Sequence, residues 1–195
     1  MTTLPTGRTV VSLLVFIVVV VVLLSLAGAT NRVRATQNGN MKSSAVALQP
    51  NSLCAKSERI IFSCLSKRSG SKLFKLVSLC GSRDLSKERG YLQYRYGLPG
   101  KVELEFPSSR TGTQQLFTYH HYLRYRVDLT EINFEINDYQ YQIFNDYNGE
   151  EKREESNQGV TVTPPNQGKE ITFLCRSKVK ADYINLEDVL NRAQE

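Results

Sequence analysis

The hydrophobic positions of the chain follow two patterns, one continuous and one alternating. Residues 10–29 carry no charge and include five consecutive valines at 18–22. Between residues 59 and 176 the apolar residues occur instead in short runs that alternate with polar residues and are separated by turn formers. The first pattern is typical of a segment that enters a membrane, and the second of half-buried β-strands.

The apolar segment supports two interpretations. Ala27-Gly28-Ala29, followed by Thr30, is the small-x-small pattern at which signal peptidase cleaves. A signal's apolar core usually runs ~7–15 residues, however, whereas ~20 apolar residues span a bilayer. Residues 1–29 are therefore a cleaved signal peptide, cut between Ala29 and Thr30, or a single transmembrane anchor. Either one carries the chain out of the cytoplasm.

Beyond it, residues 30–53 are polar and lack periodicity, which predicts a flexible linker. Residues 59–65 and 72–79 then form a predicted hairpin. Residues 91–96 and 102–106 form another, around Pro99-Gly100, a type II turn signature.

A bulge at Gly97 is needed to place the apolar residues of that second hairpin on one face. It leaves Arg95 on the other face, opposite Glu103 or Glu105. The apolar set is Leu92, Tyr94, Tyr96, Val102, Leu104 and Phe106.

Residues 117–129 alternate as one long strand, and the parity of the apolar positions flips at Thr130-Glu131, which predicts a bulge or corner. Asn137-Asp138 fits a two-residue hairpin turn because both residues tolerate left-handed backbone. That turn sets the register of the next pairs, which are Ile136 with Tyr139, Phe134 with Tyr141 and Ile132 with Ile143.

The remaining segments complete the predicted domain, residues 54–195. Residues 148–158 are acidic and predict a mobile surface loop, and 160–162 and 171–175 predict two strands. Asn185 can cap a short helix that buries Leu186, Val189 and Leu190. The predicted fold is all-β: a small antiparallel barrel or sandwich of about seven or eight strands, with an N-terminal apolar helix and a short C-terminal helix.

Four cysteines allow three disulfide pairings. A hairpin turn near Gly70 brings Cys80 close to residue 60, within reach of Cys54, and leaves Cys64 too far along the strand to bond Cys80. This geometry favours Cys54–Cys80 together with Cys64–Cys175. A zinc site is disfavoured because the short spacing between paired ligands is absent.

The charge is uneven along the chain. The formal net charge is +6, with 17 Lys/Arg against 5 Asp/Glu in residues 31–126 and 7 against 14 in residues 127–195. Such asymmetry indicates an anionic partner or two surfaces that pair within the fold, and antiparallel pairing of distant strands favours the second.

No motif indicates catalysis, a metal or a cofactor. His120 and His121 are adjacent in a predicted strand, so they point to opposite faces and cannot act as a pair, with His121 on the apolar face. The oxygen-rich residues 146–150 lack the remainder of a calcium loop and predict a solvated turn. We therefore expect a protein that is not an enzyme, with no catalytic residues.

Rings and cations alternate on two predicted strand faces. This combination binds single-stranded nucleic acid or anionic glycans. No nucleic acid is expected for an exported protein, which leaves an anionic glycan, an acidic protein or an anionic membrane face; alternatively, Glu103 and Glu105 neutralise an ordinary solvated surface. The candidate binding residues are Tyr91, Gln93 and Arg95 on one strand and His120, Tyr122, Arg124 and Arg126 on the other.

Four blocks carry a resemblance to known proteins: Cys64, Ser78-Leu79-Cys80-Gly81-Ser82, Gly90-Tyr91-Leu92-Gln93-Tyr94-Arg95-Tyr96-Gly97 and Glu103-Leu104-Glu105-Phe106-Pro107. They resemble a group of small exported bacterial envelope proteins of unknown function, over about residues 54–176. In overall plan the chain is also similar to periplasmic lysozyme inhibitors, small disulfide-bearing β-barrels behind a signal, although it has none of their inhibitory motifs.

The resemblance implies a location in the periplasm or on the periplasmic face of the inner membrane. The resulting hypothesis is a non-enzymatic exported or membrane-anchored envelope protein with a binding or inhibitory domain for a protein or glycan. The alternatives are a structural envelope component without a dedicated ligand and, third, a hydrolytic enzyme.

Overall fold

The computed structural model describes residues 48–150, 155–166, 168–183 and 185–193. The chain divides into two compact units, Met1–Ser44 and Ala45–Glu195, and every described residue belongs to the second. The predicted N-terminal helix, the cleavage position at Ala29 and Thr30, and most of the predicted linker lie outside the described residues.

Within the described ranges, no helix has the length and apolar character needed to span a membrane.

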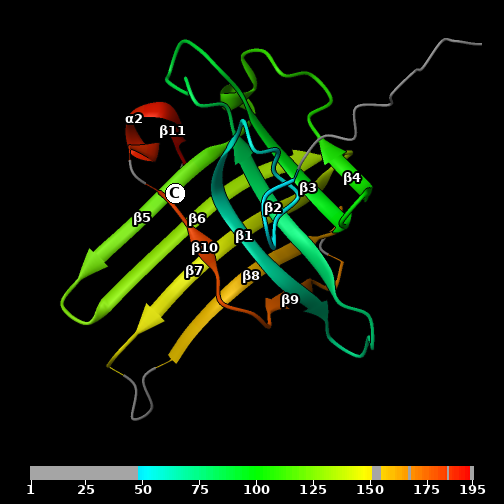
Figure 1. Cartoon of the computed structure of the whole chain (residues 1–195). Helices are drawn as coiled ribbons and strands as arrows, with labels where there is room; N and C mark the ends of the chain where they lie inside the picture. The colour runs from blue at the N-terminus through cyan, green and yellow to red at the C-terminus, as the bar shows by residue number, and fades with distance from the viewer. Residues whose placement is uncertain (1–47, 151–154, 167, 184, 194–195) are drawn as a thin grey trace, which may run out of the picture. The chain divides into compact units, whose positions relative to one another are not determined.

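The second unit is all-β, as predicted. It is built on one mostly antiparallel sheet with the strand order β11-β5-β6-β7-β8-β9-β1-β2-β3-β4, and β10 pairs with β1 beside β9 (Figure 1). The elements are β1 (Arg59–Arg68), β2 (Lys75–Gly81), β3 (Leu92–Leu98), β4 (Lys101–Phe106), the 3-10 helix η1 (Thr113–Leu116), β5 (Thr118–Arg124), β6 (Val127–Ile136), β7 (Tyr139–Asn148), β8 (Glu155–Thr163), β9 (Ile171–Cys175), β10 (Lys180–Ala181), α2 (Leu186–Val189) and β11 (Asn191–Arg192).

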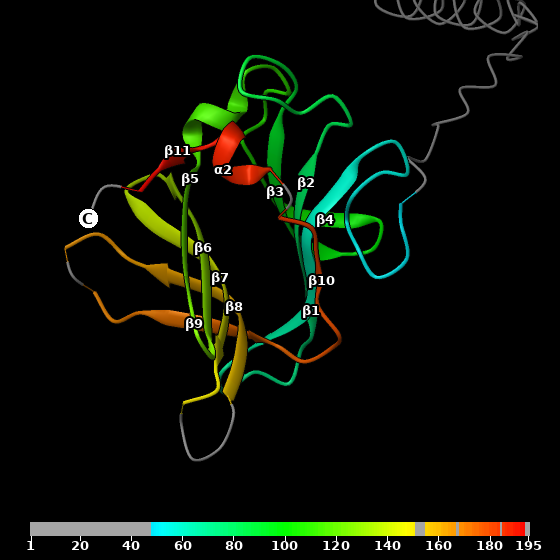
Figure 2. The same ribbon diagram turned by 90° about the vertical axis from the view of Figure 1, so that its left-hand side faces the viewer.

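The sheet curls into a half-barrel instead of closing. Seen edge-on in Figure 2, β5–β9 lie on one side and β1–β4 on the other, with α2 between them at one end. The expected barrel or sandwich of seven or eight strands is therefore replaced by a single curled sheet of eleven. Two of the added strands, β10 and β11, are only two residues long, which is too short to leave a sequence pattern.

Aromatic rings fill the concave side of the sheet. Phe134 lies at their centre, stacked on Phe106 and Tyr141 at centroid distances of 5.7 and 5.1 Å. Phe117 and Tyr94 contact the same ring at 5.1 and 5.0 Å. These residues come from β3, β4, β6, β7 and the segment before β5, so the cluster joins the two sides of the half-barrel by packing.

Two predicted turns are confirmed. Asn137 and Asp138 take φ values of 48° and 65°, and the strands they join pair in the expected register. The pairing of β3 with β4 shifts at Gly97, the predicted bulge. A Cβ at Gly97 would come within 2.5 Å of the Lys101 carbonyl oxygen, so glycine is required there.

The predicted long strand over residues 117–129 is wrong, because a turn at Tyr125-Arg126 divides it into β5 and β6. Arg126 adopts φ 59°, which its side chain does not favour. Because the turn has two residues, odd-numbered residues such as Tyr119 face the core before it and even-numbered residues such as Ile132 face the core after it. The parity flip was thus the signature of a hairpin, and the register of β6 with β7 contains no bulge at Thr130-Glu131.

Part of the predicted loop 148–158 is strand instead, because β8 begins at Glu155 and its residues 155–158 pair with β7 back to Asn148. Strand pairing satisfies the backbone there without help from apolar side chains. The short C-terminal helix is confirmed as α2, with Leu186 and Leu190 in the core; its cap residue Asn185 makes no side-chain capping hydrogen bond.

Candidate functional site

Both disulfides have the favoured pairing, Cys54–Cys80 and Cys64–Cys175. Cys80 lies opposite Ile60 in the β1–β2 hairpin, as the turn near Gly70 predicts. Cys54, Glu58 and Cys80 cluster within 4.8 Å, but both sulfurs are consumed by the disulfide. Because no free thiolate remains among the described cysteines, this cluster is not a metal site.

The first predicted binding surface, on β3, is covered. The end of the predicted linker packs onto the convex face of β1–β3, so Leu53 is fully buried and the domain begins before Cys54 (Figures 1 and 2). The Leu53 N–H donates to the Ser78 hydroxyl at 3.0 Å, and the Cys54–Cys80 bond fixes the segment. Beneath it, Gln93 and Arg95 are 0% and 3% exposed, so neither can meet a ligand.

Arg95 is held by a polar network in which Arg95 and Glu58 are buried and Glu105 reaches solvent. Its guanidinium donates to both carboxylate oxygens of Glu58 at 2.7 and 2.8 Å, to Glu105 at 2.9 Å and to the Leu53 carbonyl. Tyr91 donates its hydroxyl to Glu58 at 2.7 Å. The predicted Arg95–Glu105 pair therefore forms, but Arg95 itself is buried in a structural network with Glu58 and does not lie on a solvated face.

Two opposing effects set the pKa of Glu58. Burial raises it, and the hydrogen bonds from Arg95, Tyr91 and the Ala55 N–H lower it. The hydrogen bonds prevail, so the pKa lies below its usual value and the carboxylate stays charged beside Arg95. This pair anchors the N-terminal segment.

The second predicted surface lies on β5, at the opposite end of the strand order from β3, so the two predicted strands do not form one surface. Its charges are paired: Arg124 bonds Glu150, and His120 lies 3.7 Å from Glu131. His121 is exposed instead of half-buried and bonds Asp128 at 2.9 Å. Arg126 lies in the β5–β6 turn, beyond the strand, and Tyr122 is 44% exposed. The adjoining hollow of about 290 Å³ is lined by one cation and one carboxylate, Arg192 and Glu187, so its charge does not favour an anion.

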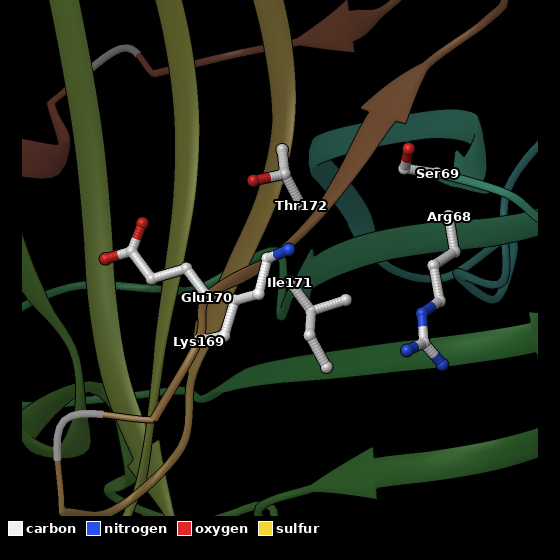
Figure 3. Close-up of a pocket in the computed structure, with 6 residues that line it drawn as sticks. All are labelled: Arg68, Ser69, Lys169, Glu170, Ile171 and Thr172. Carbon is white, nitrogen blue, oxygen red and sulfur yellow. The ribbon is translucent and has the colours of Figure 1, made fainter.

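A different site is hollowed between the β1–β2 hairpin and β9. Two adjoining clefts of about 450 and 490 Å³ share Arg68, Ser69 and Thr172. Figure 3 shows the residues that line the first. Antiparallel pairing places Lys67 opposite Leu174 and Arg68 opposite Phe173. The lining residues are Lys67, Arg68, Ser69, Gly70, Lys169, Glu170, Ile171, Thr172, Leu174 and Arg176.

The two adjoining clefts, together called the basic cleft, are lined by Arg68, Lys169 and Glu170 in the first and by Lys67, Arg68 and Arg176 in the second. Among the described residues, neither Lys67, Arg68, Lys169 nor Arg176 forms an ion pair. In Figure 3, Ile171 lies between Arg68 and Lys169, and the Glu170 carboxylate points away from the guanidinium. Glu170 accepts a hydrogen bond from Thr163 at 3.3 Å. The cleft therefore presents uncompensated positive charge, suited to a phosphate, sulfate or carboxylate group.

The residues around Gly70 predict only a hairpin turn, so the sequence pattern did not indicate this site. A signal existed in the predicted Cys64–Cys175 bond. That bond implies that the residues just after Cys64 lie beside the strand ending at Cys175, so Lys67 and Arg68 must approach residues 172–176. The cleft offers no catalytic arrangement: no histidine or carboxylate is bonded to the Ser69 hydroxyl in the part of the chain that the structure describes.

Comparison with protein-family models, curated proteins and solved structures finds no match for this chain.

Proposed function

We propose that this protein is a non-enzymatic binding domain of the bacterial cell envelope that holds an anionic group in the basic cleft. One observation carries the proposal: Arg68 is shared by two adjoining clefts, of which one also holds Lys169 and the other Lys67 and Arg176, and none of these cations has an ion-pair partner among the described carboxylates. Unpaired like charges repel one another, and a bound anion relieves that repulsion.

The two disulfides indicate an oxidising, extracytoplasmic compartment. Within it we propose the periplasm if residues 1–29 are cleaved, or the periplasmic face of the inner membrane if they are retained. Both settings are rich in phosphate-bearing and carboxylate-bearing glycans and lipids, which supply the chemistry that the cleft would bind.

The test is a titration of the full chain, in neutral detergent, with inorganic pyrophosphate followed by phosphorus NMR. Replacing Arg68 and Lys169 by Gln should weaken binding about tenfold per cation, because each charge-assisted contact contributes ~1.5 kcal/mol or more. The matched control replaces two exposed cations elsewhere, Lys87 and Lys101, by Gln and should change binding little.

Equal affinity in the two double variants would contradict the proposal. The absence of any saturable binding would do so too, and would favour a structural envelope component without a dedicated ligand.

A further inference from the structure

The tip of the β1–β2 hairpin exposes two consecutive apolar side chains beside the basic cleft. Leu73 is 70% exposed and Phe74 is 43% exposed. The turn before them is ordered: the Ser71 N–H donates to the Arg68 carbonyl at 3.0 Å, and the Leu73 N–H donates to the Ser71 hydroxyl at 3.0 Å. Hydrophobic side chains held outward at the end of a hairpin incur a hydration cost that burial in a partner would remove.

The charge around this tip has one sign. From Arg59 to Gly81 the hairpin holds five Lys/Arg and no Asp/Glu. The Lys67 ammonium lies 5.5 Å above the centre of the Phe74 ring, so a cation and an apolar group are presented together. Of the five cations, Lys75 is neutralised by Glu103 and Arg59 by Asp182, which leaves Lys67, Arg68 and Lys72 around the tip.

An anionic bilayer surface matches this combination. Its interface accepts apolar and aromatic side chains at the depth of the headgroups, and its lipid phosphates attract Lys and Arg just above that depth. We propose that the β1–β2 hairpin docks on an anionic lipid bilayer, with Leu73 and Phe74 inserted at the interface and a headgroup phosphate bound in the basic cleft. This inference rests on the proposed function, because it identifies the source of the anion.

A contrasting hairpin shows why charge matters here. The β5–β6 turn exposes Leu123 and Tyr125 at 68% and 85%, yet its two cations, Arg124 and Arg126, are matched by two nearby carboxylates, Glu150 and Asp128. It has the apolar surface without the net positive charge, so it provides the control. A soluble anionic glycan would use the cations of the β1–β2 hairpin and leave Leu73 in water.

Chain length allows the docking whether or not the N-terminal segment is retained. Residues 30–47 separate the apolar segment from the described domain, and fully extended they reach at most about 60 Å. An anchored domain could therefore still meet the surface with its hairpin.

The chain contains no tryptophan, so a single introduced Trp is an unambiguous reporter. The full chain with Phe74→Trp is mixed with vesicles of phosphatidylcholine alone or of phosphatidylcholine with phosphatidylglycerol, some carrying brominated acyl chains. We expect a blue shift and bromolipid quenching of the Trp at position 74 only when phosphatidylglycerol is present. A second reporter, Tyr125→Trp, should show neither effect.

Two further changes, made in the Phe74→Trp background, separate the contributions. Leu73→Ser should weaken the affinity for the vesicles about thirtyfold, since burying a leucine side chain is worth ~2 kcal/mol, and should leave pyrophosphate binding unchanged. Lys67→Gln with Arg68→Gln should reduce both quenching and pyrophosphate binding, and added salt should weaken both.

Pyrophosphate binding without quenching at position 74 would overturn the bilayer inference and leave the anion-binding cleft standing, with a soluble glycan or an acidic protein as the partner. Loss of both would overturn the proposed function as well. Equal quenching of the two Trp reporters, or quenching without phosphatidylglycerol, would also overturn the bilayer inference, because it would come from the N-terminal segment or from non-specific adsorption.

Discussion

At the scale of single residues, Asp146 on β7 is a carboxyl group in an unfavourable place. Its Oδ1 atom is buried and has no hydrogen-bond partner among the described residues. Burial, with a smaller contribution from the nearby Glu131 carboxylate, raises the pKa of Asp146 to about 6. At neutral pH the folded protein must therefore hold a poorly solvated negative charge.

We expect Asp146→Asn to stabilise the protein at about pH 7 and to lose that advantage at about pH 4. Because the folded-state pKa of Asp146 is raised, the wild-type chain gains stability as the pH falls from about 6 towards 4. The Asp146→Asn variant lacks this titrating group, so its stability has no such pH dependence. The expected gain at neutral pH is on the order of 1 kcal/mol, after allowance for partial solvent exposure. Urea unfolding at both pH values measures it; a difference that does not change with pH would contradict the explanation.

Arg95 shows what residue patterns can and cannot predict. Strand alternation correctly placed it on the face opposite Tyr94 and beside Glu105. Alternation does not say what covers that face, and here Leu53 and Glu58 cover it. The covering segment contains mainly small and polar residues, so it carried no hydrophobic signal. A buried network was consequently mistaken for a solvated binding surface.

At the scale of elements, residues 48–58 form neither a helix nor a strand of the sheet. Two attachments hold this segment against the sheet. One is the Glu58–Arg95 ion pair, and the other is the Cys54–Cys80 disulfide. The segment also shields Ser63 and Ser78, whose hydroxyls hydrogen-bond to each other beneath it at 2.9 Å. If it lifted away, these polar groups would be hydrated while Leu53 would lose its burial.

Replacing Cys54 and Cys80 together by Ser should destabilise the domain by about 3 kcal/mol, given the sequence separation of 26 residues. The opening should be local. Amide hydrogen exchange should accelerate at Leu53 and at Ala55, whose N–H donates to Glu58, much more than in the β6–β7 hairpin. Uniform acceleration across both regions would show instead that the segment unfolds only with the whole sheet.

Two hairpin turns explain why one part of the topology was predictable and another was not. Asn137-Asp138 uses residues that tolerate positive φ, so its turn and register could be inferred from sequence. Tyr125-Arg126 makes a turn of the same length, but neither residue is typical of turns, so the sequence gives no local turn signal. Its evidence was the change of apolar parity several residues later, and parity alone cannot distinguish a hairpin from a bulge.

At the scale of the whole domain, the half-barrel depends on the contact between β1 and β9, where its two sides meet. Only three residue pairs make this contact, Ser66 with Cys175, Lys67 with Leu174 and Arg68 with Phe173. The all-β class and both disulfides followed from short-range patterns and cysteine spacing. The predicted Cys64–Cys175 bond implied that the two segments are close, but the register of their pairing did not follow from the sequence, because the side chains on the two strands have no complementary pattern.

The Cys64–Cys175 disulfide reinforces this contact, and the basic cleft lies directly beside it. Replacing both cysteines by Ser removes a bridge between residues 111 positions apart, which gives the unfolded chain more conformational freedom. The expected loss of stability is about 5 kcal/mol, more than for the Cys54–Cys80 pair. Because Lys67 and Arg68 come from β1 while Arg176 follows β9, a loosened contact should also separate the cations. We therefore expect weaker pyrophosphate binding in this variant and nearly unchanged binding in the Cys54–Cys80 variant.

Urea unfolding and phosphorus NMR on the two double variants measure both effects, under conditions in which each variant is still folded. If the Cys54–Cys80 variant were the one that lost the anion, the ligand would have to lie near the N-terminal segment, against our assignment to the cleft. If both variants kept it, the three residue pairs of the β1–β9 contact would be sufficient to hold the cations together. The disulfide would then contribute to stability alone, because loop closure limits the unfolded chain regardless of how firmly the native contact is held.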